Sequence, residues 1–243
     1  MRFFRKKKRL DAKEMIDKLL SKYYPHYDPK LFYKQIWETM CSAIKIASNT
    51  AQKILMIDYY IDHLINEISS SYALLTVHPF YLNLSKDEKP YFDQPRNWFP
   101  NYYFDSEHNK QFVITGVEKK DISKAKLIAL VSKTDNIPYY LYKHQQNEET
   151  FFHDRDCRFL PYLNLCIASI CDHHRLSAIK MSGKKVIVSA EIYDITLLFP
   201  YVETNGETWI HNTSLKTENE PVFDFRFALL FSLAKMKYEL EQQ

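Results

Sequence analysis

The sequence predicts an α+β protein in which a helical N-terminal region, residues 1–71, is packed on a mixed-sheet domain, residues 72–243, that ends in a helix. Three observations support this fold class. Apolar residues recur at helical spacing from residue 11 to residue 70, strand-like runs follow from residue 72, and helical spacing returns from 223 to 240. A chain of 243 residues can also bury a core without disulfides or metals.

The N-terminal region is expected to hold two or three helices. Asp11 is a candidate N-cap, with Glu14 three residues later, for a helix over residues 12–23. Pro25 and Pro29 bracket a turn. Further helices are expected over 30–47 and 51–70, with Ser48-Asn49-Thr50 as the break between them. Their apolar faces require burial against the rest of the protein.

The pattern then changes to strands and loops. Residues 72–84 are rich in strand formers, and residues 85–110 form a long irregular segment that contains Pro90, Pro95 and Pro100. Strands are expected over 111–117 and 137–142. For residues 121–133 a helix and a strand both remain open.

The C-terminal third is the easiest part of the chain to interpret. It predicts a buried strand over 163–170, a polar turn over 171–175, a short helix over 175–181 that ends at Gly183, and a strand over 185–194. Asn205-Gly206 between apolar runs indicates a β-hairpin. An amphipathic helix is expected over 223–240.

Composition excludes some classes of site and suggests a compartment. Only 3 glycines are present, so no GxGxxG or Walker A phosphate loop can be written. The 4 cysteines form no CxxC pair, which disfavours a structural zinc site. No signal peptide and no apolar run long enough to span a membrane is found, so we expect a cytoplasmic protein with reduced thiols and no transmembrane segment.

Charge is concentrated at the N-terminus. Residues 2–9 contain six basic side chains and no acidic one; 33 basic residues less these six leaves 27, against 30 acidic residues, in the rest of the chain. The body is therefore not a broadly basic nucleic-acid binder. The basic tip, with Phe3 and Phe4, is either a solvated terminus or a clamp on nucleic acid, an acidic partner or an anionic membrane surface.

Asp172-His173-His174-Arg175 is the first candidate site, because it lies between a predicted strand and a predicted helix start. A helix N-terminus presents free N–H groups to phosphate, and Arg175 adds a bidentate anion donor. Asp172 can cap the helix or help to hold a metal, and the two histidines titrate near neutral pH. A capped polar turn without chemistry is the alternative interpretation.

A second cluster, His153-Asp154-Arg155-Asp156-Cys157-Arg158, precedes this turn. Asp154 and Asp156 can bind Mg or Mn, with His153 beside them. If the segment 159–170 returns across the sheet, this cluster and the Asp172 turn can meet, which would combine a metal, a general base and phosphate-binding arginines. The alternative is a charged loop bonded to itself.

The stretch from Ile170 to Ala190 resembles the strand–DGxHR–helix–G–strand signature of the ParB/sulfiredoxin-like superfamily. Asp172, His174 and Arg175 fall on its D, H and R positions, and Ala178 falls on the small helix position. His173 stands where the superfamily has glycine, a residue that lets phosphate approach the backbone. The resemblance implies binding of nucleotide or nucleic-acid phosphate and, in some members, hydrolysis or transfer of phosphate.

From the motif and the resemblance together we expect a metal-dependent nuclease, phosphohydrolase or phosphotransferase. His174, Asp172 and His153 would be catalytic, Arg175, His173 and Arg158 would bind phosphate, and Asp154 and Asp156 would hold the metal. The alternative is a non-catalytic interaction or accessory protein of a bacterial defence, phage or plasmid system. Such a protein would dock a partner protein through its N-terminal helices and aromatic surfaces.

Overall fold

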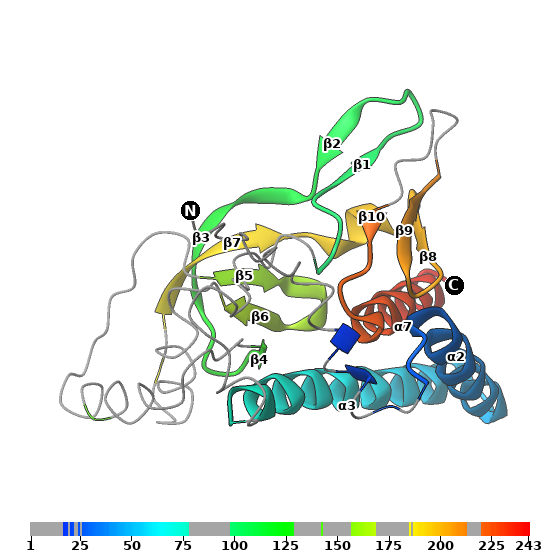
Figure 1. The fold of residues 1–243 in the computed structure, drawn as a ribbon. Helices are drawn as coiled ribbons and strands as arrows, with labels where there is room; N and C mark the ends of the chain where they lie inside the picture. Colours follow the sequence, from blue (N-terminus) through cyan, green and yellow to red (C-terminus); the bar gives the residue numbers. More distant parts are fainter. Residues whose placement is uncertain are drawn as a thin grey trace, which may run out of the picture.

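The computed structural model describes residues 17, 18, 20, 21, 24, 26–77, 98–128, 142, 157–168, 185, 187–212 and 220–243, with the backbone alone for 72–77. These residues form an α+β fold, as predicted, with helices on one side and sheets on the other (Figure 1). The predicted Asp11 cap and the basic tip lie outside the described residues, whereas Asp17, Lys18, Leu20 and Ser21 are helical.

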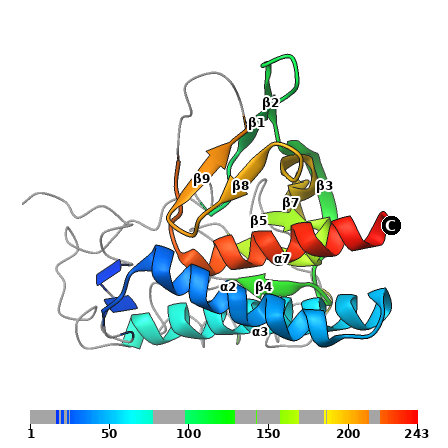
Figure 2. The same cartoon turned by 90° about the vertical axis from the view of Figure 1, so that its right-hand side faces the viewer.

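Three long helices pack against one another and together form the helix layer of the fold (Figure 2): α2, Pro29–Ile46; α3, Thr50–Val77; and α7, Phe225–Glu241. α2 begins where expected because Asp28 Oδ1 accepts hydrogen bonds from the backbone N–H groups of Lys30 and Leu31, and Pro29 occupies the first helical turn. At the break before α3, Asn49 Oδ1 accepts from the N–H of Gln52. Both predicted helices are confirmed.

α3 is longer than its apolar pattern predicted. The expected strand over 72–84 is wrong for residues 72–77, which are helical, and residues 78–84 lie outside the described part. Propagating an existing helix adds one hydrogen bond for each residue fixed, and Ala73, Leu74 and Leu75 are good helix formers. The strand propensity of the neighbouring residues is too weak to end the helix.

The C-terminal helix α7 is confirmed, but only its second half is amphipathic. From Phe225 to Phe231 every residue is buried, including Arg226. α7 contacts α3 and α2 on one side and β8 of a sheet on the other. Because its first turns are enclosed on all sides, they need apolar residues at nearly every position.

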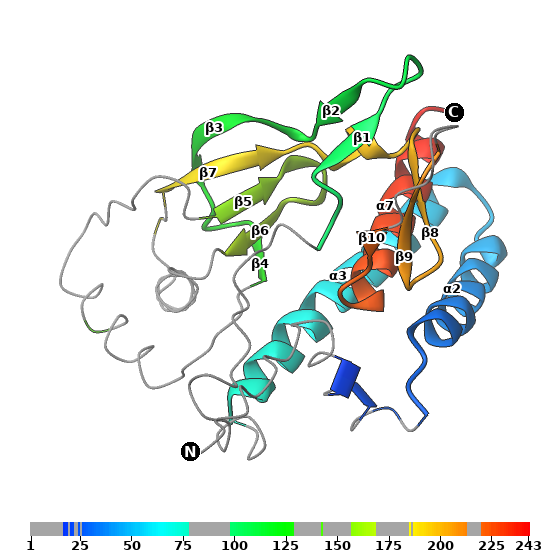
Figure 3. The same cartoon turned by 45° about the horizontal axis from the view of Figure 1, so that its top comes forward.

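A mixed sheet of five strands within the described residues has the order β3-β7-β5-β6-β4 (Figure 3). The strand pairs β3–β7 and β5–β6 are antiparallel, whereas β5–β7 and β4–β6 are parallel. The prediction of a mixed sheet is confirmed. The strands are β3, Ile114–Asp121; β4, Lys126–Ile128; β5, Cys157–Leu160; β6, Leu165–Ala168; and β7, Ile187–Tyr193.

A smaller antiparallel sheet contains β8, Val202–Thr204; β9, Thr208–His211; and β10, Glu220–Pro221. The predicted Asn205-Gly206 hairpin joins β8 to β9. Asn205 Oδ1 accepts from the N–H groups of Glu207 and Thr208, and Gly206 has a φ of 88°. A Cβ atom at residue 206 would lie 2.2 Å from Cβ of Tyr33, so both the backbone and the space require glycine here.

Several strand predictions needed correction. The expected strand 111–117 is divided at Val113 between β2, Lys110–Phe112, and β3. β1, Tyr102–Phe104, lies in the segment that was expected to be irregular. Residues 121–128 contain the end of β3, a turn and β4, so the helical option fails there, and Tyr142 has helical backbone where a strand was expected. Long-range pairing partners select these strands, and local sequence does not encode them.

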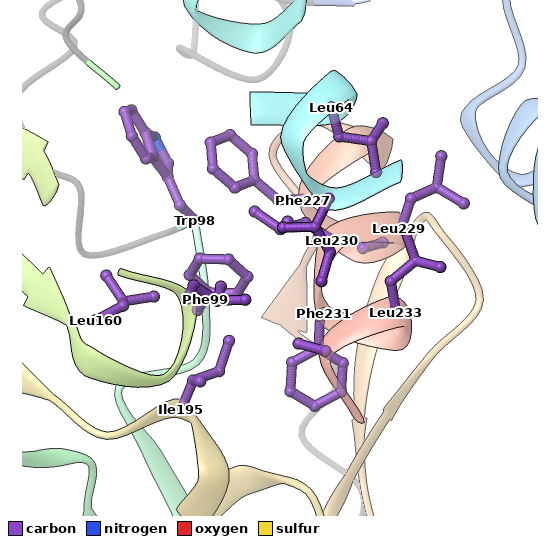
Figure 4. Packing of buried hydrophobic residues seen from close by; sticks show 14 of the residues in the cluster. Leu64, Trp98, Phe99, Leu160, Ile195, Phe227, Leu229, Leu230, Phe231 and Leu233 are labelled. Carbon is purple, nitrogen blue, oxygen red and sulfur yellow. The ribbon is translucent and has the colours of Figure 1, made fainter. Parts of the chain in front are cut away.

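The main hydrophobic core lies between the helix layer and the sheets, and it combines aliphatic side chains with aromatic rings (Figure 4). The ring centroid of Phe227 lies 4.7 Å from that of Trp98 and 5.5 Å from that of Phe99, the latter edge to face. Trp209 packs 5.3 Å from Phe231. This core includes residues from both sides of position 71, and the predicted domain boundary there stays a prediction.

Candidate functional site

Of the residues predicted to form the site, Arg158 lies within the described part of the chain. The turn Asp172-His173-His174-Arg175 and the cluster residues His153, Asp154 and Asp156 lie outside the described part of the chain, as do the predicted turn 171–175 and helix 175–181. Their roles therefore stay predictions. The described strands β5, β6 and β7, which flank these residues in the sequence, show where the chain enters and leaves the two clusters.

Arg158 is a buried residue of β5 whose guanidinium group has protein partners. Its Nε lies 3.0 Å from Glu191 Oε2 on β7, its Nη1 donates to Asn101 Oδ1 at 2.9 Å, and the group lies 5.7 Å from the ring centroid of Tyr193. A buried guanidinium is stable only when its charge and N–H groups are matched. Arg158 thus joins two parallel strands to the segment that leads into β1.

The two predicted clusters are attached at one end of the five-stranded sheet. β6 runs antiparallel to β5, so the chain returns across the sheet, which is the condition under which the two clusters can meet. In this pairing Cys157, which follows Asp156, faces Ala168, the last residue of β6. Cys157 also faces Ala190, the central residue of β7, the strand that follows the predicted helix. The chain therefore enters β5 and leaves β6 at neighbouring positions, and β7 begins three residues before the partner of Cys157.

The residues at this end are small and buried. Cys157, Cys166, Ala168 and Ala190 belong to a second core cluster on the opposite face of the sheet from the helices, and Ile122 and Ala125 are also members. The cysteines are free thiols. No group of three or more histidine, cysteine or acidic side chains within the described residues is placed to hold a metal ion.

A groove of about 320 Å³ lies where α3 meets α7, β4 and the 3-10 turn η2, Pro161–Leu163. Asp58 on α3 pairs with Lys237 on α7 at 2.7 Å, and Asp62, one turn along α3, pairs with Lys126 on β4. Because each ammonium group that lines the groove is already matched by a carboxylate, the groove offers no unbalanced charge to a ligand.

Tyr162 closes one side of this groove. Its hydroxyl donates to Glu241 Oε2 at 2.8 Å. Burial, followed by the hydrogen bond and charge of Glu241, raises the pKa of Tyr162 far above its usual value, so the phenol stays protonated. Sequence reasoning missed the groove, because the spacing of Asp58 and Asp62 shows one helix face but not its neighbours.

His211 on β9 forms a second polar cluster that sequence reasoning missed. The side chain is 1% exposed, and its Nε2 lies 3.7 Å from Glu220 Oε1 on β10, beyond hydrogen-bond distance. The ring of Tyr102 stacks on the imidazole with centroids 5.2 Å apart and planes 8° apart, and Phe104 meets it edge to face. The alternation Thr-Trp-Ile-His, with Trp209 in the core, was the available sign that residue 211 points inward.

Glu220 is held in its charged form. Burial acts to raise the pKa of this carboxyl, but its interactions with the His211 and Tyr102 side chains and the charge of Lys110 outweigh burial, and the pKa lies below its usual value. Lys110 itself lies 3.6 Å from the centroid of the Tyr102 ring.

A family model described as "Family of unknown function (DUF6710)" matches residues 3–243. The chain belongs to the DUF6710 family. No curated protein and no solved structure matches it. The DUF6710 match begins before α2 and ends with α7, so the helix layer and all the described strands lie within the family region. None of the helices in the described ranges is both long enough and apolar enough to cross a membrane.

Proposed function

We propose that this DUF6710 protein binds the phosphate groups of a nucleotide or nucleic acid at Asp172–Arg175 and cleaves or transfers phosphate with a divalent ion. The observation that carries the proposal is the pairing of Cys157 with Ala168. Asp156, one of the two proposed metal ligands, directly precedes Cys157, and Asp172 follows Ala168 by four residues. Chain connectivity from these paired positions supports a shared site.

Each residue type in the proposed site has a chemical task. Arg175 and His173 would contact phosphate oxygens, with the bidentate arginine providing most of the orientation. Asp154 and Asp156 offer carboxylate oxygens to Mg or Mn, and such an ion would polarise a phosphoryl oxygen and lower the pKa of a bound water. His174, Asp172 and His153 would hold or move the proton during attack on phosphorus.

Isothermal titration tests the proposal with a panel of nucleoside mono-, di- and triphosphates and short RNA and DNA, with Mg or Mn present. We expect binding of at least one member by the unaltered protein. Arg175→Ala should weaken that binding about tenfold or more, since a bidentate charged contact is lost. Lys185→Ala removes an exposed cation close by in the sequence and is the matched control. Failure of the unaltered protein to bind any member would disprove the proposal.

A specific observation favours a second function, docking of a partner protein on the N-terminal helices. Large apolar side chains are exposed on α2 and α3: Leu31 is 47% exposed, Ile46 83%, Leu55 68% and Tyr59 60%. Leu55 and Tyr59 lie one turn apart on α3. Exposed apolar and aromatic residues are common at protein interfaces.

Surface variants are the suitable test of docking, because Ile57, Ile61 and Ile65 of α3 belong to the main core and removing the helix would expose that core. If docking is the function, the double variant Leu55→Ser, Tyr59→Ser will abolish the cellular activity while Arg175→Ala leaves it intact. The reverse result supports phosphate chemistry. In either proposal the basic residues 1–9 would contact an anionic membrane surface, and flotation of vesicles with the protein, with and without these residues, tests that contact. A cytoplasmic location remains part of both proposals.

A further inference from the structure

The strands β1 and β2 pair only with each other within the described residues and form a two-stranded ribbon, residues 102–112. The ribbon rises from the five-stranded sheet beside β9 and β10 (Figure 1). At its base the N–H of Val113 donates to the carbonyl of Asn101, and the N–H of Asp194 donates to the carbonyl of Val113. The base is therefore anchored by backbone bonds, whereas the ribbon itself meets the smaller sheet through side chains.

The side-chain contact has His211 at its centre. Tyr102 and Phe104 of β1 cover the imidazole, and neither of its nitrogens has a hydrogen-bond partner in the part of the chain that the structure describes. A neutral imidazole always carries one N–H donor and one acceptor lone pair. Leaving both buried and unmatched is costly, so His211 is an unusual residue to enclose in this interface.

Protonation changes the balance of forces on His211. An imidazolium would face the Glu220 carboxylate, whose Oε1 lies 3.7 Å from Nε2, and would stack on the face of the Tyr102 ring. Both contacts favour a positive charge, and burial opposes it. Lys110 of β2 lies over the same Tyr102 ring and repels the imidazolium, whereas Val202, the β8 partner of His211, is apolar. Glu220 is thus the nearby group that can offset the cost of burial.

We propose that His211 and Glu220 form a pH-sensitive latch that holds the ribbon against strand β9. Proton uptake by His211 strengthens the docking of Tyr102 and Phe104, and proton release weakens it. The carboxylate of Glu220, with Oε1 3.7 Å from Nε2 of His211, determines the direction of the latch. Without that carboxylate, a buried imidazolium would push the ribbon away.

Amide hydrogen exchange of residues 102–112, corrected for the intrinsic effect of pH, tests the latch. Between about pH 8 and about pH 5.5 we expect protection of the unaltered ribbon to rise roughly three- to tenfold, in line with the linkage of one proton to docking. Glu220→Gln should reverse the sign, so that protection falls on acidification. His211→Phe keeps a stacking ring without a titrating group and should make protection independent of pH.

His108→Asn is the matched control, because it removes the histidine of the ribbon itself while asparagine tolerates its φ of 64°. This variant should keep the pH response of the unaltered protein. The latch is overturned if the unaltered ribbon shows no pH response, if His108→Asn abolishes the response, or if Glu220→Gln leaves its sign unchanged. Should His211→Phe fail to fold, the sign reversal in Glu220→Gln remains a sufficient test.

Discussion

The guanidinium group of Arg158 and the carboxylate of Glu191 form a buried ion pair, 3.0 Å from Nε to Oε2, across the parallel strands β5 and β7. The side chains are 7% and 19% exposed, so water screens the pair poorly. Asn101 receives a further hydrogen bond from the same guanidinium. One residue therefore connects the sheet to the base of the ribbon.

Arg158→Ala should lower the free energy of unfolding by about 3–5 kcal/mol, because it leaves the Glu191 carboxylate unpaired in a largely buried position. Urea denaturation measures the loss. The comparison is Lys120→Ala, which breaks an exposed pair with Glu118 and should change stability by no more than about 0.5 kcal/mol. Equal effects of the two substitutions would show that Arg158 is not structural.

Gly206→Ala should destabilise the protein by more than about 1 kcal/mol, because residue 206 has a positive φ and its new Cβ would meet the Tyr33 side chain. Gly116→Ala is the matched control, since nothing lies within 4 Å of a Cβ built there. Thermal unfolding compares the two. Similar melting temperatures would mean that α2 can move away from the β8–β9 hairpin without cost.

Phe231→Ala should cost about 3–5 kcal/mol, because it opens a cavity between Trp209, Phe199 and the helix layer. Phe112→Ala changes the same residue type on the ribbon, where the ring is 68% exposed, and should have an effect of about 0.5 kcal/mol or less. Denaturant midpoints with unchanged slopes give both values. A small loss for Phe231→Ala would indicate that the core closes around the missing ring.

The free energy of unfolding should fall at alkaline pH because Tyr24 loses its proton there. The hydroxyl of Tyr24 donates a hydrogen bond to Glu67 Oε1 at 2.9 Å. Burial and then the charge of Glu67 raise the pKa of Tyr24 to about 12, from 10.0. The folded state therefore holds this proton more tightly than the unfolded chain does. Its contribution is complete below about pH 10 and is lost as the pH rises toward about 12.

Tyr24→Phe should remove that part of the alkaline loss, and unfolding curves from about pH 9 to about pH 12 measure the difference from the unaltered protein. Tyr59→Phe, at a 60% exposed position on α3, is the comparison. If the two variants follow the same pH dependence, the contact between Tyr24 and Glu67 does not hold the proton.

The sequence by itself determined the elements that depend on local rules. Helical spacing located α2 and most of α3, and Asn205-Gly206 located the hairpin, because helix periodicity and tight turns involve residues a few positions apart.

Only the tertiary structure decided what depends on residues far apart in the chain. Arg158, expected at a phosphate, lies between Glu191 and Asn101, 33 and 57 positions away. His211 is enclosed by the ring of Tyr102, and the local sequence around residue 211 does not indicate this contact. The fully buried first half of α7 likewise follows from enclosure by α2, α3 and β8. Side-chain environment is a property of packing, and packing joins distant segments for which no local pattern specifies the partner.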